Sequence, residues 1–98
     1  MVWVRLTYVK VHPDKVDEVK KIYYEEIVPT LKAKVKGLID VFLLEPTDEE
    51  DEFISFARFE SKADGEAYEA SGTYKEMVDK LRHMFAGSPT LKSYEVTK

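Results

Sequence analysis

Cysteine, asparagine and glutamine are all missing from this chain of 98 residues. The absence of cysteine excludes disulfide bridges and any zinc site built from thiolates. A domain of this size buries only about 60–65% of the surface that its unfolded chain exposes. Further stability must therefore come from close packing or from a partner subunit.

The missing amides accompany a predominance of lysine and glutamate among the polar residues. Few thermolabile amides combined with many lysines and glutamates is a tendency of proteins from thermophiles. The composition therefore predicts a thermophilic protein, a property that a thermal unfolding curve measures directly.

Positive charge and long apolar runs are also scarce. Fifteen basic residues face nineteen acidic ones, for a net charge of −4, whereas nucleic-acid binding depends on a basic patch. No apolar run approaches the roughly 20 residues that span a bilayer. Residues 1–5 carry a charge within the first apolar stretch and contain no small-residue cleavage site. We therefore expect one cytoplasmic domain over residues 1–98 that binds neither nucleic acid nor membranes.

Four segments have the β-branched and aromatic character of strands. They are residues 2–11, 38–45, 52–60 and 90–97. The acidic segment 46–51 lies between the second and third of them and predicts the turn of an antiparallel hairpin.

Apolar residues at helical spacing occupy the two remaining segments. The first helix is predicted from Asp14 as its N-cap to Gly37 as its stop, with a kink at Pro29. The second segment is predicted as a helix over 62–70 and another capped by Thr73, which ends before Pro89. The order strand–helix–strand–strand–helix–strand predicts an α+β, ferredoxin-like βαββαβ fold, with a four-stranded antiparallel sheet covered by helices on one face.

Apolar residues occupy both faces of the predicted sheet, although helices cover only one. On the second strand, Leu38, Phe42 and Leu44 alternate with Ile39, Val41 and Leu43. On the third strand, Phe53, Ala57 and Phe59 alternate with Ile54 and Phe56. Soluble monomers rarely leave such a large apolar face uncovered, so we expect a symmetric homodimer. The alternative is a monomer with scattered apolar surface residues.

Several short segments resemble the antibiotic biosynthesis monooxygenase-like family, and together they span nearly the whole chain. They are GLIDVFLL at 37–44, RFESKA at 58–63, AYEAS at 67–71, the segment 81–85, AGSP at 86–89 and YEV at 94–96. The resemblance implies a dimeric α+β barrel in which two sheets pack together, with pockets between each sheet and its own helices. Members of the family include cofactor-free oxygenases of aromatic polyketides, haem-degrading enzymes and signal-molecule isomerases.

The resemblance also implies the candidate catalytic residues Tyr74 and Tyr68. Together with Arg58, which lies within an apolar strand, they would orient a small aromatic or quinoid ligand. Tyr68 stands where the family has a tryptophan, and Tyr74 matches a tyrosine of the polyketide-oxygenase branch. The oxygenase and haem-degrading branches of the family both use an asparagine, and this chain contains none. At the position where the haem-degrading branch has its haem-binding histidine, this chain has Val78. Haem degradation is therefore disfavoured, and no cofactor is expected. The alternative is that both tyrosines only pack on the sheet and find hydroxyl partners there.

Arg5 and Arg58 interrupt apolar strands, where arginine is rarely buried without a carboxylate. Their candidate partners are Glu60, Asp40 and Glu95. Alternatively, an arginine would anchor an anionic or quinone oxygen. If the face that carries the small residues Ser55 and Ala57 looks toward the helices, it leaves room for an apolar pocket. The predicted substrate-binding residues are Ser55, Ala57, Phe59 and Arg5.

No metal site is predicted. His12 and His83 are the only histidines, His83 lies away from the apolar stripe of its helix, and nothing in the spacing brings the two together. The acidic run 48–52 lacks the spacing of a calcium loop. Three hypotheses stay open: a cofactor-independent monooxygenase or related isomerase, a non-catalytic module that binds a small ligand, and an interaction protein whose dimer is its functional form.

Overall fold

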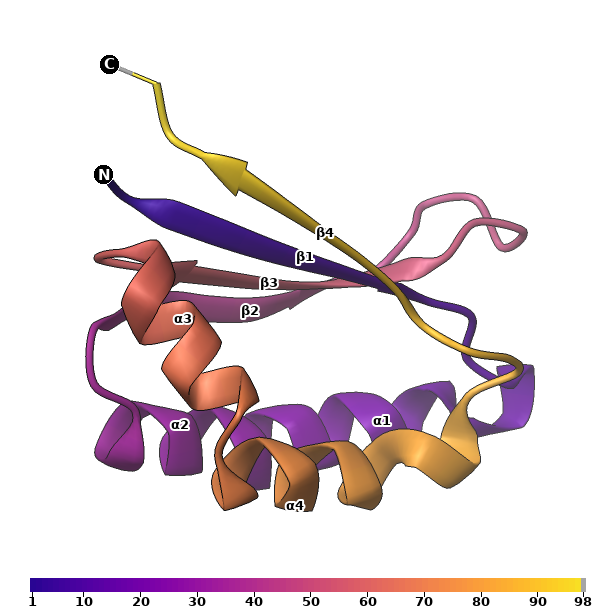
Figure 1. Cartoon of the computed structure of the whole chain (residues 1–98). Coiled ribbons are helices and arrows are strands. Elements are labelled where there is room, and N and C mark those ends of the chain that lie inside the picture. The colour runs from indigo at the N-terminus through magenta and orange to yellow at the C-terminus, as the bar shows by residue number, and fades with distance from the viewer. Residues whose placement is uncertain (98) are drawn as a thin grey trace.

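Four antiparallel strands form one sheet in the computed structural model, which describes residues 1–97 (Figure 1). The strands are β1 (Trp3–Val9), β2 (Leu38–Leu44), β3 (Phe53–Phe59) and β4 (Thr90–Glu95). Their order in the sheet is β2-β3-β1-β4, so β2 and β4 are the edges. The helices lie on one face of this sheet (Figure 1). The predicted α+β, ferredoxin-like fold is confirmed.

The first helical segment is irregular at its centre. A short 3-10 turn, η1 (Pro13–Lys15), leads into α1 (Val16–Ile22), the π-helical turn η2 (Tyr23–Ile27) and α2 (Val28–Lys34). The N–H of Val28 donates to the carbonyl of Tyr23, five residues back. Pro29 has no N–H and its ring clashes with the carbonyl four residues earlier, and the wider π-turn directly before it accommodates both effects. Pro29 therefore marks the right position, but the irregularity is a π-turn rather than a simple kink.

The second helical segment consists of α3 (Lys62–Glu69), α4 (Gly72–Leu81) and the 3-10 turn η3 (Arg82–Met84). Serine hydroxyls cap both helices, because Ser61 accepts from the N–H of Asp64 and Ser71 accepts from the N–H of Tyr74. The prediction of Thr73 as the second cap was wrong, since Ser71 takes that position. None of the helices within residues 1–97 combines the length and apolar character that a membrane span needs.

A bulge in β2 changes the predicted alternation of its side chains. The register with β3 shifts between Leu38, which pairs with Phe59, and Asp40, which pairs with Arg58. Leu38 therefore turns toward the helices, where it packs against the core cluster around Tyr23. The prediction that Leu38 shares a face with Phe42 and Leu44 was wrong for this reason.

Within residues 1–97 no helix covers the other face of the sheet (Figure 1). This face carries apolar side chains. Phe42 and Phe56 stack there with ring centroids 4.6 Å apart. Phe42 and Leu44 are 38% and 41% exposed. The predicted two-sided apolar sheet is therefore present, and we call this uncovered surface the open face.

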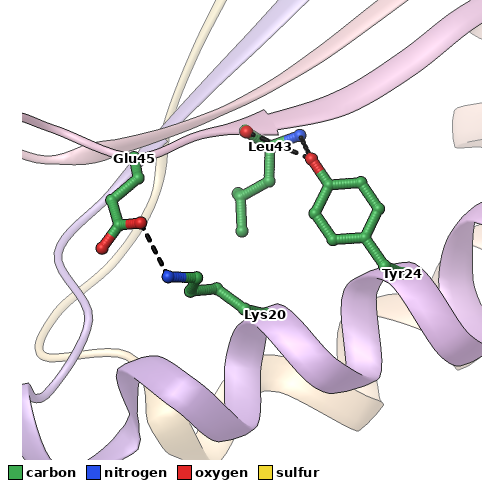
Figure 2. A network of polar contacts seen from close by, with 4 residues as sticks. All are labelled: Lys20, Tyr24, Leu43 and Glu45. Carbon is green, nitrogen blue, oxygen red and sulfur yellow. Dashed lines mark hydrogen bonds and ion pairs between the residues drawn. The ribbon is translucent and has the colours of Figure 1, made fainter.

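A tyrosine closes part of the free edge of β2 (Figure 2). The Tyr24 hydroxyl accepts from the N–H of Leu43 at 2.9 Å and donates to the carbonyl of Leu43 at 3.3 Å. One turn earlier, Lys20 forms an ion pair with Glu45 at 2.8 Å (Figure 2). The Tyr24 side chain thus occupies backbone groups of Leu43 that a foreign strand would otherwise pair with, while Lys20 and Glu45 place charges at the same edge.

We expect Gly65→Ala to destabilise the fold, because α3 packs directly on Trp3 at Gly65. A Cβ at Gly65 would lie 2.2 Å from Cζ3 of Trp3 and 3.3 Å from Cδ1 of Phe59. Such overpacking lowers the free energy of unfolding by about 1–3 kcal/mol, which urea denaturation measures. Gly72→Ala is the matched control, because nothing lies within 4 Å of its Cβ position. Equal unfolding free energies for the two variants would contradict this account of the contact.

Candidate functional site

A cavity of ≈ 140 Å³ lies between the sheet and the helices. Most of its lining is apolar, and it includes the buried side chains Ile27, Leu31, Val41, Phe59 and Met77. Pro89 and Leu91 also line the cavity and are exposed. The cavity therefore opens beside the start of β4.

Small residues on β3 make room for the cavity, as the sequence predicted. Ser55, Ala57 and Phe59 all line it, and Arg5 of β1 does so as well. The Ser55 hydroxyl is 2.8 Å from the hydroxyl of Tyr23, which is only 3% exposed. Sequence reasoning placed Tyr23 on an apolar helix stripe and overlooked its polar end; a tyrosine within such a stripe is the signal that a partner is needed.

Tyr68 at the end of α3 and Tyr74 at the start of α4 meet at the cavity wall. Their rings pack edge to face, with centroids 5.2 Å apart, and Tyr68 also lies near Phe59. Neither hydroxyl makes a hydrogen bond with another residue in the part of the chain that the structure describes. The alternative predicted that both hydroxyls find partners among the packed side chains, and within residues 1–97 neither does. Both hydroxyls are therefore able to form a hydrogen bond with a ligand.

Arg5 is held by Glu69, a residue that the sequence did not indicate. Its Nε donates to Oε2 of Glu69 at 2.6 Å and its Nη2 donates to Oε1 at 2.9 Å. The two side chains are 20% and 18% exposed, and the guanidinium carbon lies 4.8 Å from the Trp3 ring centroid. The predicted partners Glu60, Asp40 and Glu95 were wrong for Arg5, because α3 crosses β1 and brings Glu69 to it.

Arg58 is not part of this arrangement. It forms an ion pair with Asp40, which is one of its predicted partners, on the open face of the sheet. Arg5, Ser55, Ala57, Phe59, Tyr68 and Tyr74 therefore come together around the cavity, while the sheet separates Arg58 from them. For this reason Arg58 is left out of the site proposed below.

Burial keeps the cavity tyrosines protonated. It raises the pKa of Tyr23 well above its usual range, against a smaller opposing effect of the hydrogen bond with Ser55. Burial also raises the pKa of Tyr68, and the neighbouring Tyr74 adds to that effect. The pKa of Tyr74 is raised by burial and by the Glu69 carboxylate, while Arg5 acts in the opposite direction. All three hydroxyls are therefore hydrogen-bond donors at neutral pH.

The hydrogen bond with Glu69 raises the pKa of Arg5, so the guanidinium stays charged at any physiological pH. His12 and His83 are exposed and do not line the cavity. Within residues 1–97, no group of three or more histidine, aspartate or glutamate side chains is placed to hold a metal ion. The polar part of the site thus consists of neutral hydroxyls and one internal ion pair.

Comparison with known proteins identifies the family. The sequence model of the antibiotic biosynthesis monooxygenase family matches residues 3–80. The chain belongs to the antibiotic biosynthesis monooxygenase family. The resemblance derived from the sequence is thereby confirmed. No curated protein matches the chain in sequence.

Solved structures similar to this chain include proposed antibiotic biosynthesis monooxygenases. The one from Caulobacter crescentus has a TM-score of 0.86 at 18% identity, covering 99% of this chain and 91% of that chain. The one from Nitrosomonas europaea has a TM-score of 0.79 at 17% identity, with coverage of 95% and 88%. A dimeric Bacteroides fragilis protein of unknown function and ferredoxin-like fold has a TM-score of 0.75 at 16% identity, with coverage of 97% and 96%. At these identities the likeness establishes the fold alone.

We expect Tyr23 and Tyr68 to ionise only as the protein unfolds in alkali. In the unfolded chain a tyrosine loses its proton near pH 10, whereas burial raises the pKa of these two in the folded state. The folded state then binds more protons than the unfolded state, so the free energy of unfolding falls as pH rises above about 10. Absorbance at 295 nm and circular dichroism during a pH titration follow ionisation and unfolding together.

The phenylalanine variants at these positions serve as the assignment control, because each should remove one tyrosine from the ionisation step that coincides with unfolding. Ionisation of these tyrosines while the circular dichroism is still native would contradict the burial argument.

Proposed function

We propose that this chain is a monooxygenase-like enzyme that acts on a small aromatic or quinoid molecule and uses no bound cofactor. The observation that carries the proposal is the apolar cavity of ≈ 140 Å³ with unpartnered tyrosine hydroxyls at its wall. A closed apolar cavity of about 150 Å³ holds one benzene ring. The space beneath the helices therefore suits a single ring rather than a fused polycycle, and the family membership supports oxygenation as the reaction.

Tyr68 and Tyr74 would orient the ligand through its oxygen. Because their raised pKa values keep both protonated, they can donate to a phenol or quinone oxygen. Hydrogen bonds to the ionised form of a phenol lower its pKa. The phenol would enter uncharged, and the two tyrosines would stabilise the electron-rich phenolate as it forms, which is the form that reacts with dioxygen.

The proposed reaction balances with dioxygen as the only oxidant. For a phenol with a free para position, one oxygen atom becomes the new ring carbonyl and the other leaves as water. The two hydrogens of that water come from the hydroxyl group and the para carbon, so phenol and dioxygen give quinone and water. The protein would supply orientation, a dry apolar wall and donors to the developing charge.

A second candidate is a module that binds a small ring without converting it. The ion pair between Arg5 and Glu69 favours this candidate, because it uses both charged side chains of the cavity wall. Neither of them is then free to act as a base. An isomerase that acts on the same class of ligand is a variant of the enzyme proposal. The expected cytoplasmic location and thermophilic character stay predictions from the sequence.

We also propose that the protein works as a homodimer through its open face. Stacked Phe42 and Phe56, with exposed Leu44 beside them, offer an apolar surface that a second copy would cover. All six residues of β4 are exposed as well, and a partner subunit would bury part of this strand. The alternative is that this dimer is itself the functional form of an interaction protein.

The enzyme proposal predicts oxygen uptake with one-ring phenols that have a free para position, such as 2-methylphenol. Tyr68→Phe and Tyr74→Phe should each lower kcat by about tenfold, because each removes one hydrogen bond made to the developing oxyanion. An oxygen electrode measures the rate, and Tyr94→Phe, which removes an exposed hydroxyl outside the cavity, should leave it unchanged.

Absence of catalysed uptake, or equal rates in all three variants, would overturn the enzyme proposal. Retained ring binding in that case would support the binding module instead.

Light scattering should report a dimer at micromolar concentration, and Phe42→Asp should shift it to monomer by placing a charge in the apolar contact. Ala33→Asp introduces the same charge on an exposed turn of α2 and should remain dimeric. A stable, folded monomer of the unmodified chain would refute the dimer.

A further inference from the structure

Arg5 and Glu69 are the two charged residues that line the cavity. Every other described residue of the lining is uncharged at neutral pH, including the tyrosines with raised pKa values. The charge preference of the cavity therefore depends on how these two side chains are arranged.

The arrangement leaves no free positive charge for a ligand. Both oxygens of Glu69 accept from Arg5, at 2.6 and 2.9 Å, and the guanidinium also lies over the Trp3 ring. A ligand carboxylate would have to displace Glu69 from this two-point contact or lie beside its negative charge. Specificity of this kind comes from an unfavourable encounter with the wrong ligand as much as from contacts with the right one.

The packing of α3 fixes Glu69 in this position. Trp3 touches α3 at Gly65, where no side chain intervenes, and its ring also faces the guanidinium of Arg5. The same tryptophan thus sets the height of α3 above β1 and flanks the arginine that Glu69 binds. A shift of the α3 backbone that carries Glu69 away from Arg5 would require that packing to loosen.

We propose that Glu69 is the residue that sets the charge selectivity of the cavity. By neutralising Arg5, it makes the cavity a site for uncharged phenols and quinones and excludes ring carboxylates. This inference rests on the proposed function for its ligand class, because it assumes that one-ring aromatic molecules enter the cavity. The unpartnered hydroxyls of Tyr68 and Tyr74 then remain as neutral donors for the oxygen of such a ring.

The test compares two rings of nearly the same shape, 4-hydroxybenzamide and 4-hydroxybenzoate, which differ by one negative charge. Their dissociation constants are measured by calorimetry at pH 7.5 on the whole chain. The unmodified protein should bind the amide about tenfold or more tightly than the carboxylate. Glu69→Gln keeps an oxygen for Arg5 but removes the charge, so it should gain about tenfold or more in affinity for the carboxylate with little change for the amide.

Glu66→Gln is the matched control, because it removes a negative charge from an exposed position one turn earlier on the same helix. It should change both dissociation constants far less than Glu69→Gln does, because Glu66 lies outside the cavity lining and has only a small charge effect on Arg5. If Glu69→Gln does not fold, the double variant Arg5→Gln with Glu69→Gln takes its place. That variant should show a smaller ratio between the two dissociation constants than the unmodified protein, because no carboxylate then stands at the cavity wall.

The outcomes separate this inference from the proposed function. Tight amide binding with no change of carboxylate affinity in Glu69→Gln, or an equal gain in Glu66→Gln, overturns the role of Glu69 and leaves the ligand class standing. No amide binding, combined with a gain of carboxylate affinity in Glu69→Gln, supports the role of Glu69 and removes the proposed ligand class. No binding of either ring by any variant overturns both.

Discussion

The contact between Trp3 and Gly65 is the constraint on which the cavity depends. Trp3 is 2% exposed and packs against Phe59 as well as against α3. Because glycine has no side chain, α3 can approach β1 closely enough to bring Glu69 to Arg5 and Tyr68 to the cavity wall. A larger residue at position 65 would lift the helix and separate these groups.

The position and size of the cavity follow from the residues of β3. Phe53 and Phe59 fill the space under the helices at the two ends of this strand, and both are buried. Ser55 and Ala57 lie between them and are small, so the space remains open at the centre. The surrounding core consists of clusters of apolar residues around Tyr23 and around Met84, and many of their members also line the cavity.

Most of the fold could be predicted because each segment has a clear local pattern, and Ser55, Ala57 and Phe59 could be placed together because they alternate along one strand. The same alternation puts Arg58 on the opposite face from Ser55 and Ala57. The sequence alone therefore separates Arg58 from the residues that line the cavity. Glu69 could not be predicted, since its contact with Arg5 joins residues 64 positions apart through the packing of α3. The bulge in β2 was equally hidden, because both Leu38 and Ile39 are apolar and neither reveals which one turns inward.

The Tyr24 hydroxyl on Leu43 limits how copies of this chain can join through their sheets. End-to-end growth of sheets into an open fibre needs the β2 edge of one copy to meet the β4 edge of the next. With both backbone groups of Leu43 already bonded, the β2 edge is a poor acceptor for that contact. Pairing of β4 with β4 stops at two copies, so the bonded β2 edge favours closed pairing over growth into a fibre.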